Sequence, residues 1–215
     1  MNVITDIKPQ KRQSDRADIY LDNKLAFSLS SAIIHKMGLR IEQNLSASEV
    51  EELIQEDHAQ TAFDAALHFL GYRPRSEAEI RARLRRRKFD ERPIENAIQR
   101  LEEQGLIDDL AFAQFWRENR DSFSPRSKRL LEMELRTKGV PPHVIEDTLE
   151  SSDDQLNAYR AGAKKARALQ ALEYSAFREK LVALLQRRGF GYDVIGSTVE
   201  RLWSEREKAG TGNGL

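Results

Sequence analysis

The chain has 215 residues, and its 35 basic and 35 acidic side chains give a formal net charge of zero. Charged residues make up 33% and apolar residues 40%, which is ordinary for thin helical modules with much surface. The absence of cysteine excludes disulfides and thiolate metal sites. We find no apolar run near the roughly 18 residues that span a bilayer and no signal peptide. We therefore expect a cytoplasmic protein that does not bind membranes.

The first 45 residues differ from the remainder of the chain. Apolar and polar side chains alternate over 17–22 and 25–29, which is the period of a β-strand. Asp22-Asn23-Lys24 is a plausible turn between the two strands. We expect residues 1–45 to form a small antiparallel hairpin or three-stranded sheet, packed on a short helix over Ser30 to Met37.

From residue 46 onward the pattern is helical. Either Ser46 with Glu49 or Ser48 with Glu51 has the spacing of a capping box at the start of the first long helix. Gly71 marks the end of this helical segment. The sequence therefore predicts a mainly α-helical protein with a small N-terminal β segment.

One apolar pattern occurs three times, and the copies are shifted by 51 and then by 50 residues. A fixed period of this length is typical of a repeat array, in which each unit buries its apolar face against itself and its neighbours. We predict three-helix repeats over 46–106, 107–152 and 153–208, a disordered tail over 209–215, and an elongated molecule. The three copies are Ile80, Leu84, Phe89, Ile94 and Ile98; Leu131, Leu135, Val140, Ile145 and Leu149; and Leu181, Leu185, Phe190, Ile195 and Val199.

Helix boundaries inside the repeats follow from capping residues. Ser124 is expected to cap the second helix of the second repeat, with Pro125 at its first position. Pro141-Pro142 is expected to open the third helix of that repeat. The pairs Asp108-Asp109 and Asp153-Asp154 could suggest a metal site, but carboxylates at helix starts are better explained as caps.

The sequence carries no signature of catalysis. None of the four histidines has the spacing of a metal-binding helix. Phosphate-binding glycine loops and the GxSxG nucleophile motif are also absent. We therefore expect no catalytic residues, no metal site and no cofactor.

Basic side chains on the repeats are the best candidates for function. If the second helices of the repeats stack in register, their basic faces form a stripe that suits a phosphate backbone or an acidic protein groove. The alternative is a set of ordinary solvated helix faces. Trp116 is equally open, as a core residue or as an interface residue beside arginines. The candidate partner- or DNA-binding residues are Arg81, Arg85, Lys88, Trp116, Arg117, Arg120, Lys128, Arg129, Arg136, Lys164, Lys165 and Arg167.

Several motifs resemble the RecX family of regulatory proteins. These are Pro74-Arg75-Ser76-x-x-Glu79-x-x-x-x-Leu84, the block Gly105-Leu106-Ile107-Asp108-Asp109-x-x-Phe112-Ala113-x-x-Trp116, and Leu135-Arg136-x-Lys138-Gly139-Val140. Ile7-Lys8-Pro9-Gln10-Lys11 and Ile19-Tyr20-Leu21-Asp22 are similar to the β-containing extension of longer members. The third repeat lacks the Pro-Arg-Ser start and resembles the family least.

The resemblance implies tandem three-helix repeats in a curved, elongated molecule that lies in the helical groove of the filament of the recombinase RecA on single-stranded DNA. It implies modulation of RecA ATPase, strand exchange and co-protease activity, usually by inhibition although some members act positively, and so a role in homologous recombination, DNA repair and the SOS response. An alternative function is stand-alone binding of single- or double-stranded DNA. A structural adaptor is a third reading, and we expect a monomer.

Overall fold

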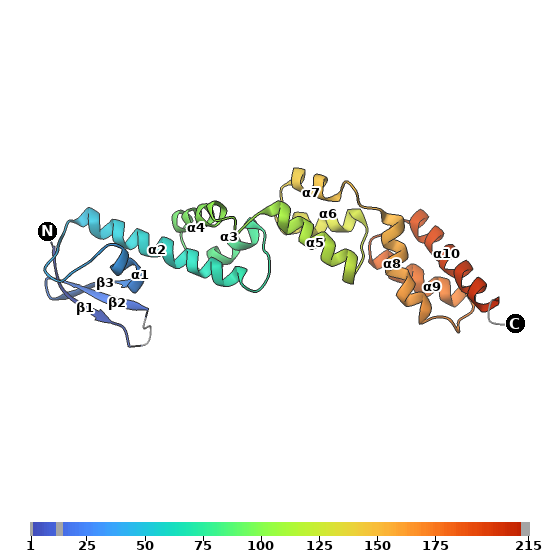
Figure 1. Ribbon diagram of the computed structural model, residues 1–215, viewed down its shortest axis with the longest axis horizontal. Coiled ribbons are helices and arrows are strands. Elements are labelled where there is room, and N and C mark those ends of the chain that lie inside the picture. The colour runs from blue at the N-terminus through green and yellow to red at the C-terminus, as the bar shows by residue number, and fades with distance from the viewer. Residues whose placement is uncertain (1, 12–14, 212–215) are drawn as a thin grey trace. The chain divides into compact units, whose positions relative to one another are not determined.

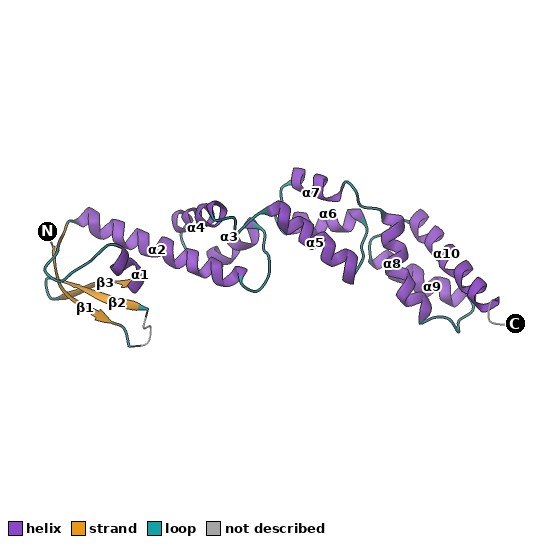
Figure 2. Cartoon of the chain, viewed as in Figure 1, coloured by secondary structure: helices purple, strands orange, loops and turns teal. Residues whose placement is uncertain are grey.

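The computed structural model describes residues 2–11 and 15–211 of the chain, and its helices and strands are drawn in Figures 1 and 2. The chain separates into two compact units, Met1–Ile107 and Asp108–Leu215. The first unit contains β1 (Asn2–Pro9), β2 (Arg16–Leu21), β3 (Lys24–Ser30), α1 (Ser31–Lys36), β4 (Asn44–Leu45), α2 (Ala47–Leu70), α3 (Glu77–Arg86) and α4 (Glu91–Glu103). The second unit contains α5 (Asp109–Phe123), α6 (Lys128–Thr137), α7 (Pro142–Leu149), α8 (Asp154–Arg167), α9 (Tyr174–Arg187) and α10 (Tyr192–Thr211).

The N-terminal strands form an antiparallel sheet in the order β3-β2-β1-β4. Asp22 and Asn23 join β2 to β3 with φ values of 47° and 64°, the left-handed backbone of a tight hairpin turn, which confirms the predicted turn. The strand β4 was not predicted. It pairs two residues with Asn2 and Val3, and a strand this short shows no alternating pattern.

The long helix α2 joins the sheet to the first three-helix repeat (Figure 1). It begins at the Ser46–Glu49 capping box, which confirms the first of the two predicted boxes. Its N-terminal half contributes Leu53 to the core under the sheet, and its C-terminal half contributes Phe63 to the core shared with α3 and α4. The buried Asp57 fixes this arrangement, because its carboxylate accepts hydrogen bonds from the guanidinium of Arg16 and from the backbone N–H of Ser30, each at 2.7 Å.

The repeated apolar pattern forms the cores of the three-helix repeats, as predicted. Ile80, Leu131 and Leu181 occupy equivalent positions and are each 0% exposed. The same is true of the next position in the pattern, which Leu84, Leu135 and Leu185 occupy. Burial of each such side chain contributes roughly 1.5–3 kcal/mol before the entropy of ordering is subtracted.

The predicted cap of α6 was wrong. Ser127, not Ser124, is the N-cap, and its hydroxyl accepts a hydrogen bond from the backbone N–H of Leu130 at 3.2 Å. Ser127 lies 51 residues after Ser76, which caps α3 in the same way, so the repeat period gives the correct position where the Ser-Pro pair does not. The other predicted caps are confirmed: Asp108 and Asp153 each accept two backbone N–H groups at the starts of α5 and α8.

The second and third repeats are joined by hydrogen bonds from backbone N–H groups inside the second unit. The backbone N–H of Ser127 donates to the carbonyl oxygen of Arg188 at 3.0 Å, and that of Lys128 donates to the Asp154 carboxylate at 2.7 Å. Gly189, at φ 84°, is required at this joint, because a Cβ atom there would lie 2.7 Å from the Ser127 hydroxyl oxygen. The corner between α9 and α10 therefore packs against the N-terminus of α6.

The last helix is longer than predicted. We expected it to end near Glu207, before a disordered tail over 209–215, but α10 extends to Thr211. Lys208 and Ala209 are good helix formers, and the single Gly210 costs only about 1 kcal/mol relative to alanine. The final part of the predicted tail, 212–215, lies outside the described residues.

Candidate partner-binding surface

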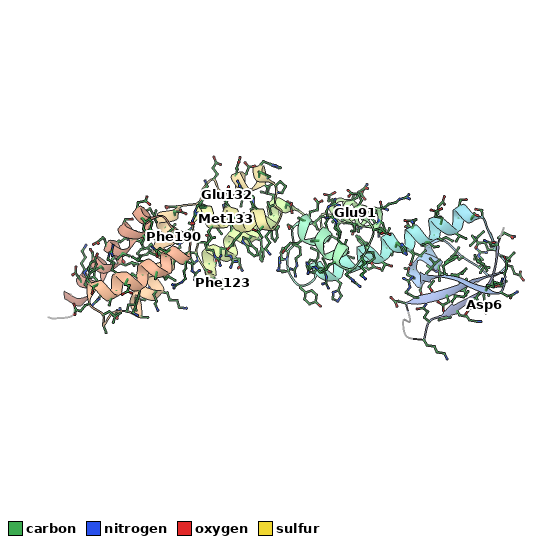
Figure 3. The ribbon with its side chains drawn as sticks, turned by 180° about the vertical axis from the view of Figure 1, so that it is seen from behind. Asp6, Glu91, Phe123, Glu132, Met133 and Phe190 are labelled. Atoms are coloured by element: carbon green, nitrogen blue, oxygen red, sulfur yellow. The ribbon has the colours of Figure 1, made fainter. Side chains whose placement is uncertain are left out.

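Two of the predicted contact residues on α3 are engaged in ion pairs within the first unit. Arg81 bonds Glu77 at 2.5 Å and Glu95 at 2.7 Å, and these carboxylates, Glu95 most, raise the pKa of its guanidinium. Arg85 pairs with Glu91, the residue that begins α4 and is labelled in Figure 3, through two hydrogen bonds of 2.7 and 2.9 Å. Arg81 and Arg85 thus link α3 to α4, and the prediction that they contact a partner remains untested.

Three neighbouring unpaired cations lie at the C-terminal end of α3. Arg86, Arg87 and Lys88 are exposed, and in the described part of the chain none of them has a carboxylate partner. We call these three residues the α3 cation cluster. The contact residues predicted from the sequence include Lys88, Arg81 and Arg85 but not Arg86 or Arg87. Glu77, four residues before Arg81, could have indicated from the sequence that Arg81 is paired, since that spacing brings opposite charges together on a helix.

Trp116 and its two neighbouring arginines hold the second repeat together. The indole N–H of Trp116 donates to Glu134 at 2.8 Å, and the Nε of Arg120 donates to the same carboxylate oxygen at 2.9 Å. The guanidinium of Arg120 also lies 4.7 Å from the Trp116 ring centroid, and burial lowers its pKa. Arg117 donates to the carbonyl oxygen of Thr148 at 2.6 Å, which ties α5 to the end of α7. These contacts favour the core interpretation of Trp116.

Of the predicted contact residues on α6, one is in an ion pair and two are not. Arg136 pairs with Glu132 one turn earlier at 2.5 Å, and Figure 3 labels Glu132 on this helix. The side chains of Lys128 and Arg129 are exposed and, within the described residues, neither side chain has a carboxylate partner. A cavity of about 290 Å³ beside Lys128 is rimmed by carboxylates, so this face of α6 is not uniformly basic. Its lining residues are Lys128, Glu132, Ile145, Glu146, Asp147, Leu149 and Glu150.

The last turn of α8 carries the clearest cations of the second unit. Lys164, Lys165 and Arg167 are exposed, and across the described residues none of them has a carboxylate within ion-pair distance. We call them the α8 cation cluster. The α8 cation cluster lies on the first helix of its repeat, whereas α3 is the second helix of its own. The prediction that the second helices form a basic stripe stays a prediction.

The described residues contain no group of three or more histidine, cysteine, aspartate or glutamate side chains placed to hold a metal ion. Over the same residues, no helix is both long and apolar enough to cross a bilayer. Each compact unit carries one of the two cation clusters.

Four family models match the chain in order. They describe the N-terminal domain of regulatory protein RecX (residues 2–46) and the first, second and third three-helix domains of RecX (62–101, 108–149 and 153–199). Together they account for the sheet and for each of the repeats described above.

Curated relatives and solved structures agree with these matches. Regulatory protein RecX of Halalkalibacterium halodurans is 33% identical over 91% of this chain and 76% of its own length. The protein of the same name from Clostridium perfringens is 29% identical over 94% of this chain and 97% of its own length. A crystal structure of regulatory protein RecX has a TM-score of 0.67 at 24% identity, covering 93% of this chain and 100% of the other. The structure of RecX from Lactobacillus salivarius has a TM-score of 0.58 at 26% identity, covering 68% and 97%. The chain therefore belongs to the RecX family of regulatory proteins.

Proposed function

We propose that this protein is a non-catalytic regulator that binds the RecA–single-stranded DNA filament in its helical groove. The observation that carries the proposal is the ordered match of all four RecX domains over most of the chain. The exposed cation clusters of the two units add the charge that an anionic filament attracts.

Binding of this kind inhibits RecA because the regulator binds one conformational state of the filament more tightly than the other. A ligand shifts a conformational equilibrium only by the difference between its affinities for the two states. A regulator that binds one filament state more tightly therefore opposes the changes that accompany nucleotide turnover. ATP hydrolysis, strand exchange and co-protease activity all decrease, because each requires that turnover or the free groove.

The test is RecA ATPase on single-stranded DNA with this protein titrated in. The informative variant combines Arg86→Ala, Arg87→Ala and Lys88→Gly, because glycine suits the φ of 64° at position 88. We expect inhibition by the parent and at least tenfold weaker inhibition by the variant. No effect of the parent at saturating concentration on ATPase or strand exchange contradicts the proposal.

The matched control removes three exposed cations elsewhere in the first unit: Lys11→Ala, Lys24→Ala and Arg40→Ala. It changes the net charge by the same amount and leaves the α3 cation cluster intact. Inhibition by the control should equal that of the parent. An equal loss in both triple variants would mean that total charge, and not the cluster, sets the affinity.

The same unpaired cations favour a second candidate, direct binding of nucleic acid without RecA. Each phosphate contact releases counterions, so this binding must weaken steeply with salt. Fluorescence anisotropy with a single-stranded and a double-stranded oligonucleotide at several salt concentrations tests it. Undetectable or salt-insensitive binding rejects this candidate and leaves the filament proposal standing.

A further inference from the structure

The first two repeats differ in charge at one pair of equivalent positions. Arg75 and Arg126 lie 51 residues apart, each between the proline and serine of a Pro-Arg-Ser segment. The partner position on the following helix is Arg83 in the first repeat and Glu134 in the second. The two repeats therefore show the same local structure once with a carboxylate at the partner position and once without it.

In the second repeat, the carboxylate pairs with the arginine, although the Nε of Arg126 is itself buried without a hydrogen-bond partner. Glu134 accepts a hydrogen bond from the guanidinium of Arg126, besides those from Trp116 and Arg120. The Glu134 side chain is 14% exposed and that of Arg126 is 27% exposed, so the pair is partly shielded from water. Charge-assisted hydrogen bonds of this kind are among the strongest polar contacts in proteins.

In the first repeat, the equivalent arginine has a second arginine where the carboxylate would be. The guanidinium carbon of Arg75 lies 3.9 Å from the ring centroid of Phe69, and that of Arg83 lies 5.6 Å from the same centroid. Burial and then the positive charge of Arg73 lower the pKa of Arg75, the carboxylate of Glu79 raises it, and the charge of Arg83 lowers it further, with a net lowering. The nearby Glu79 is held by Arg73 through two hydrogen bonds of 3.0 and 2.9 Å.

The pair therefore lacks a hydrogen-bonded anion, although the charge of Glu79 acts on Arg75. Among the described residues, neither Arg75 nor Arg83 is hydrogen-bonded to a carboxylate, whereas Arg126 is; the buried Nε atoms of Arg75 and Arg126 both lack a hydrogen-bond partner. Two guanidinium groups against one aromatic ring repel each other, and an oxyanion between or beside them relieves that repulsion.

We propose that the Arg75–Arg83 pair binds a carboxylate side chain of a protein partner, in the role that Glu134 plays within the second repeat. The repeat comparison favours a carboxylate over a phosphate, because Glu134 is the group that occupies the equivalent position. The assignment rests on the proposed function in so far as the partner is the RecA filament. It adds the chemistry of one contact: an aspartate or glutamate of the partner against the first repeat.

The critical variant is Arg83→Glu, which gives the first repeat the carboxylate of the second. The introduced carboxylate would pair with Arg75 and occupy the place of the partner's carboxylate. The variant should therefore fold and have a higher melting temperature than the parent. Lys24→Glu is the matched control, because it makes the same charge change at an exposed hairpin position of the first unit.

The probe is a hexaglutamate peptide, titrated by calorimetry at low salt, with inorganic phosphate and a single-stranded oligonucleotide as separate arms. We expect hexaglutamate to bind the parent and Lys24→Glu equally, and Arg83→Glu at least tenfold more weakly. Absent binding of hexaglutamate to the parent, or unchanged binding to Arg83→Glu, overturns the proposal. Tighter, Arg83-dependent binding of phosphate or the oligonucleotide also overturns it, since the site would then be a phosphate site.

A parallel filament-binding assay separates this inference from the proposed function. If the parent binds RecA filaments and Arg83→Glu binds them equally well, the carboxylate contact is wrong and the regulator proposal stands. If the parent does not bind filaments, the proposed function fails, and the peptide titration decides the carboxylate site by itself.

Discussion

Lys88 has a backbone conformation that lysine rarely adopts. The corner after the second helix of each repeat needs a left-handed residue, and the second and third repeats use Gly139 and Gly189, at φ 75° and 84°. The first repeat places Lys88 there, at φ 64°. A Cβ atom in this region costs roughly 1–2 kcal/mol, so the lysine is retained against a conformational penalty. Its side chain is exposed within the α3 cation cluster, which we propose contacts the partner.

Replacing Lys88 by glycine should therefore separate stability from binding. We expect Lys88→Gly to be more stable than the parent by about 0.5–1 kcal/mol, since relief of strain exceeds the entropy gained by the unfolded chain. Urea denaturation followed by circular dichroism measures the difference. Lys88→Ala keeps the Cβ atom and removes the charge, so it should gain nothing. A glycine variant less stable than the alanine variant would contradict the strain argument.

Among the helices, the second repeat depends on the carboxylate of Glu134 on α6. It receives hydrogen bonds from Trp116 and Arg120 on α5 and from Arg126 in the loop between the two helices. These donors come from residues that the sequence presents as a basic, aromatic surface. The cations of the second repeat thus serve largely to hold helices together, which explains why so few of its predicted contact residues are unpaired.

The Glu134→Gln variant tests this role. It keeps the shape of the side chain and removes the charge that three donors share, so we expect a loss of about 2–3 kcal/mol in the free energy of unfolding. Chemical denaturation followed by circular dichroism gives the value. Glu132→Gln, two residues away, breaks the exposed pair with Arg136 and should cost less than about 0.5 kcal/mol. Equal losses in the two variants would show that Glu134 is an ordinary surface residue.

The helices and their buried faces were predictable from the sequence where a pattern repeats. Contacts between helices were less predictable. The spacing of Leu84 and its equivalents identified the cores, because burial on one helix face imposes a period. Ser127 was missed because Ser-Pro is a locally attractive cap, although the repeat period gave the correct residue. The pairing of Arg85 with Glu91 required the geometry of the α3–α4 corner, which spacing within one helix cannot supply.

For the whole molecule, a net charge of zero hides an uneven distribution of unpaired cations. Ion pairs within each unit neutralise many of the basic residues, and the α3 and α8 cation clusters remain exposed in separate compact units. If both clusters contact one polyanion, they should bind more tightly together than either alone, because the second contact forms at a high effective concentration once the first has formed. The candidate list from the sequence included four of these six residues and lacked Arg86 and Arg87.

Salt dependence can show whether both clusters contact the same polyanion. We compare the Arg86→Ala, Arg87→Ala, Lys88→Gly variant with a second triple variant, Lys164→Ala, Lys165→Ala and Arg167→Ala. On single-stranded DNA, free or within a RecA filament, removal of three phosphate contacts should reduce the slope of log affinity against log salt by about 2, and removal of both clusters by about 4.

The two reductions add if each cluster contacts phosphates at the same time, since counterion release counts contacts regardless of where they lie on the protein. A slope that changes with one cluster alone assigns the polyanion contact to a single unit. A loss of filament affinity without any change of slope assigns the cluster to side chains of RecA, because such a contact releases few condensed counterions. Titrations between about 50 and 200 mM salt distinguish these outcomes, since phosphate contacts change the affinity steeply over that range.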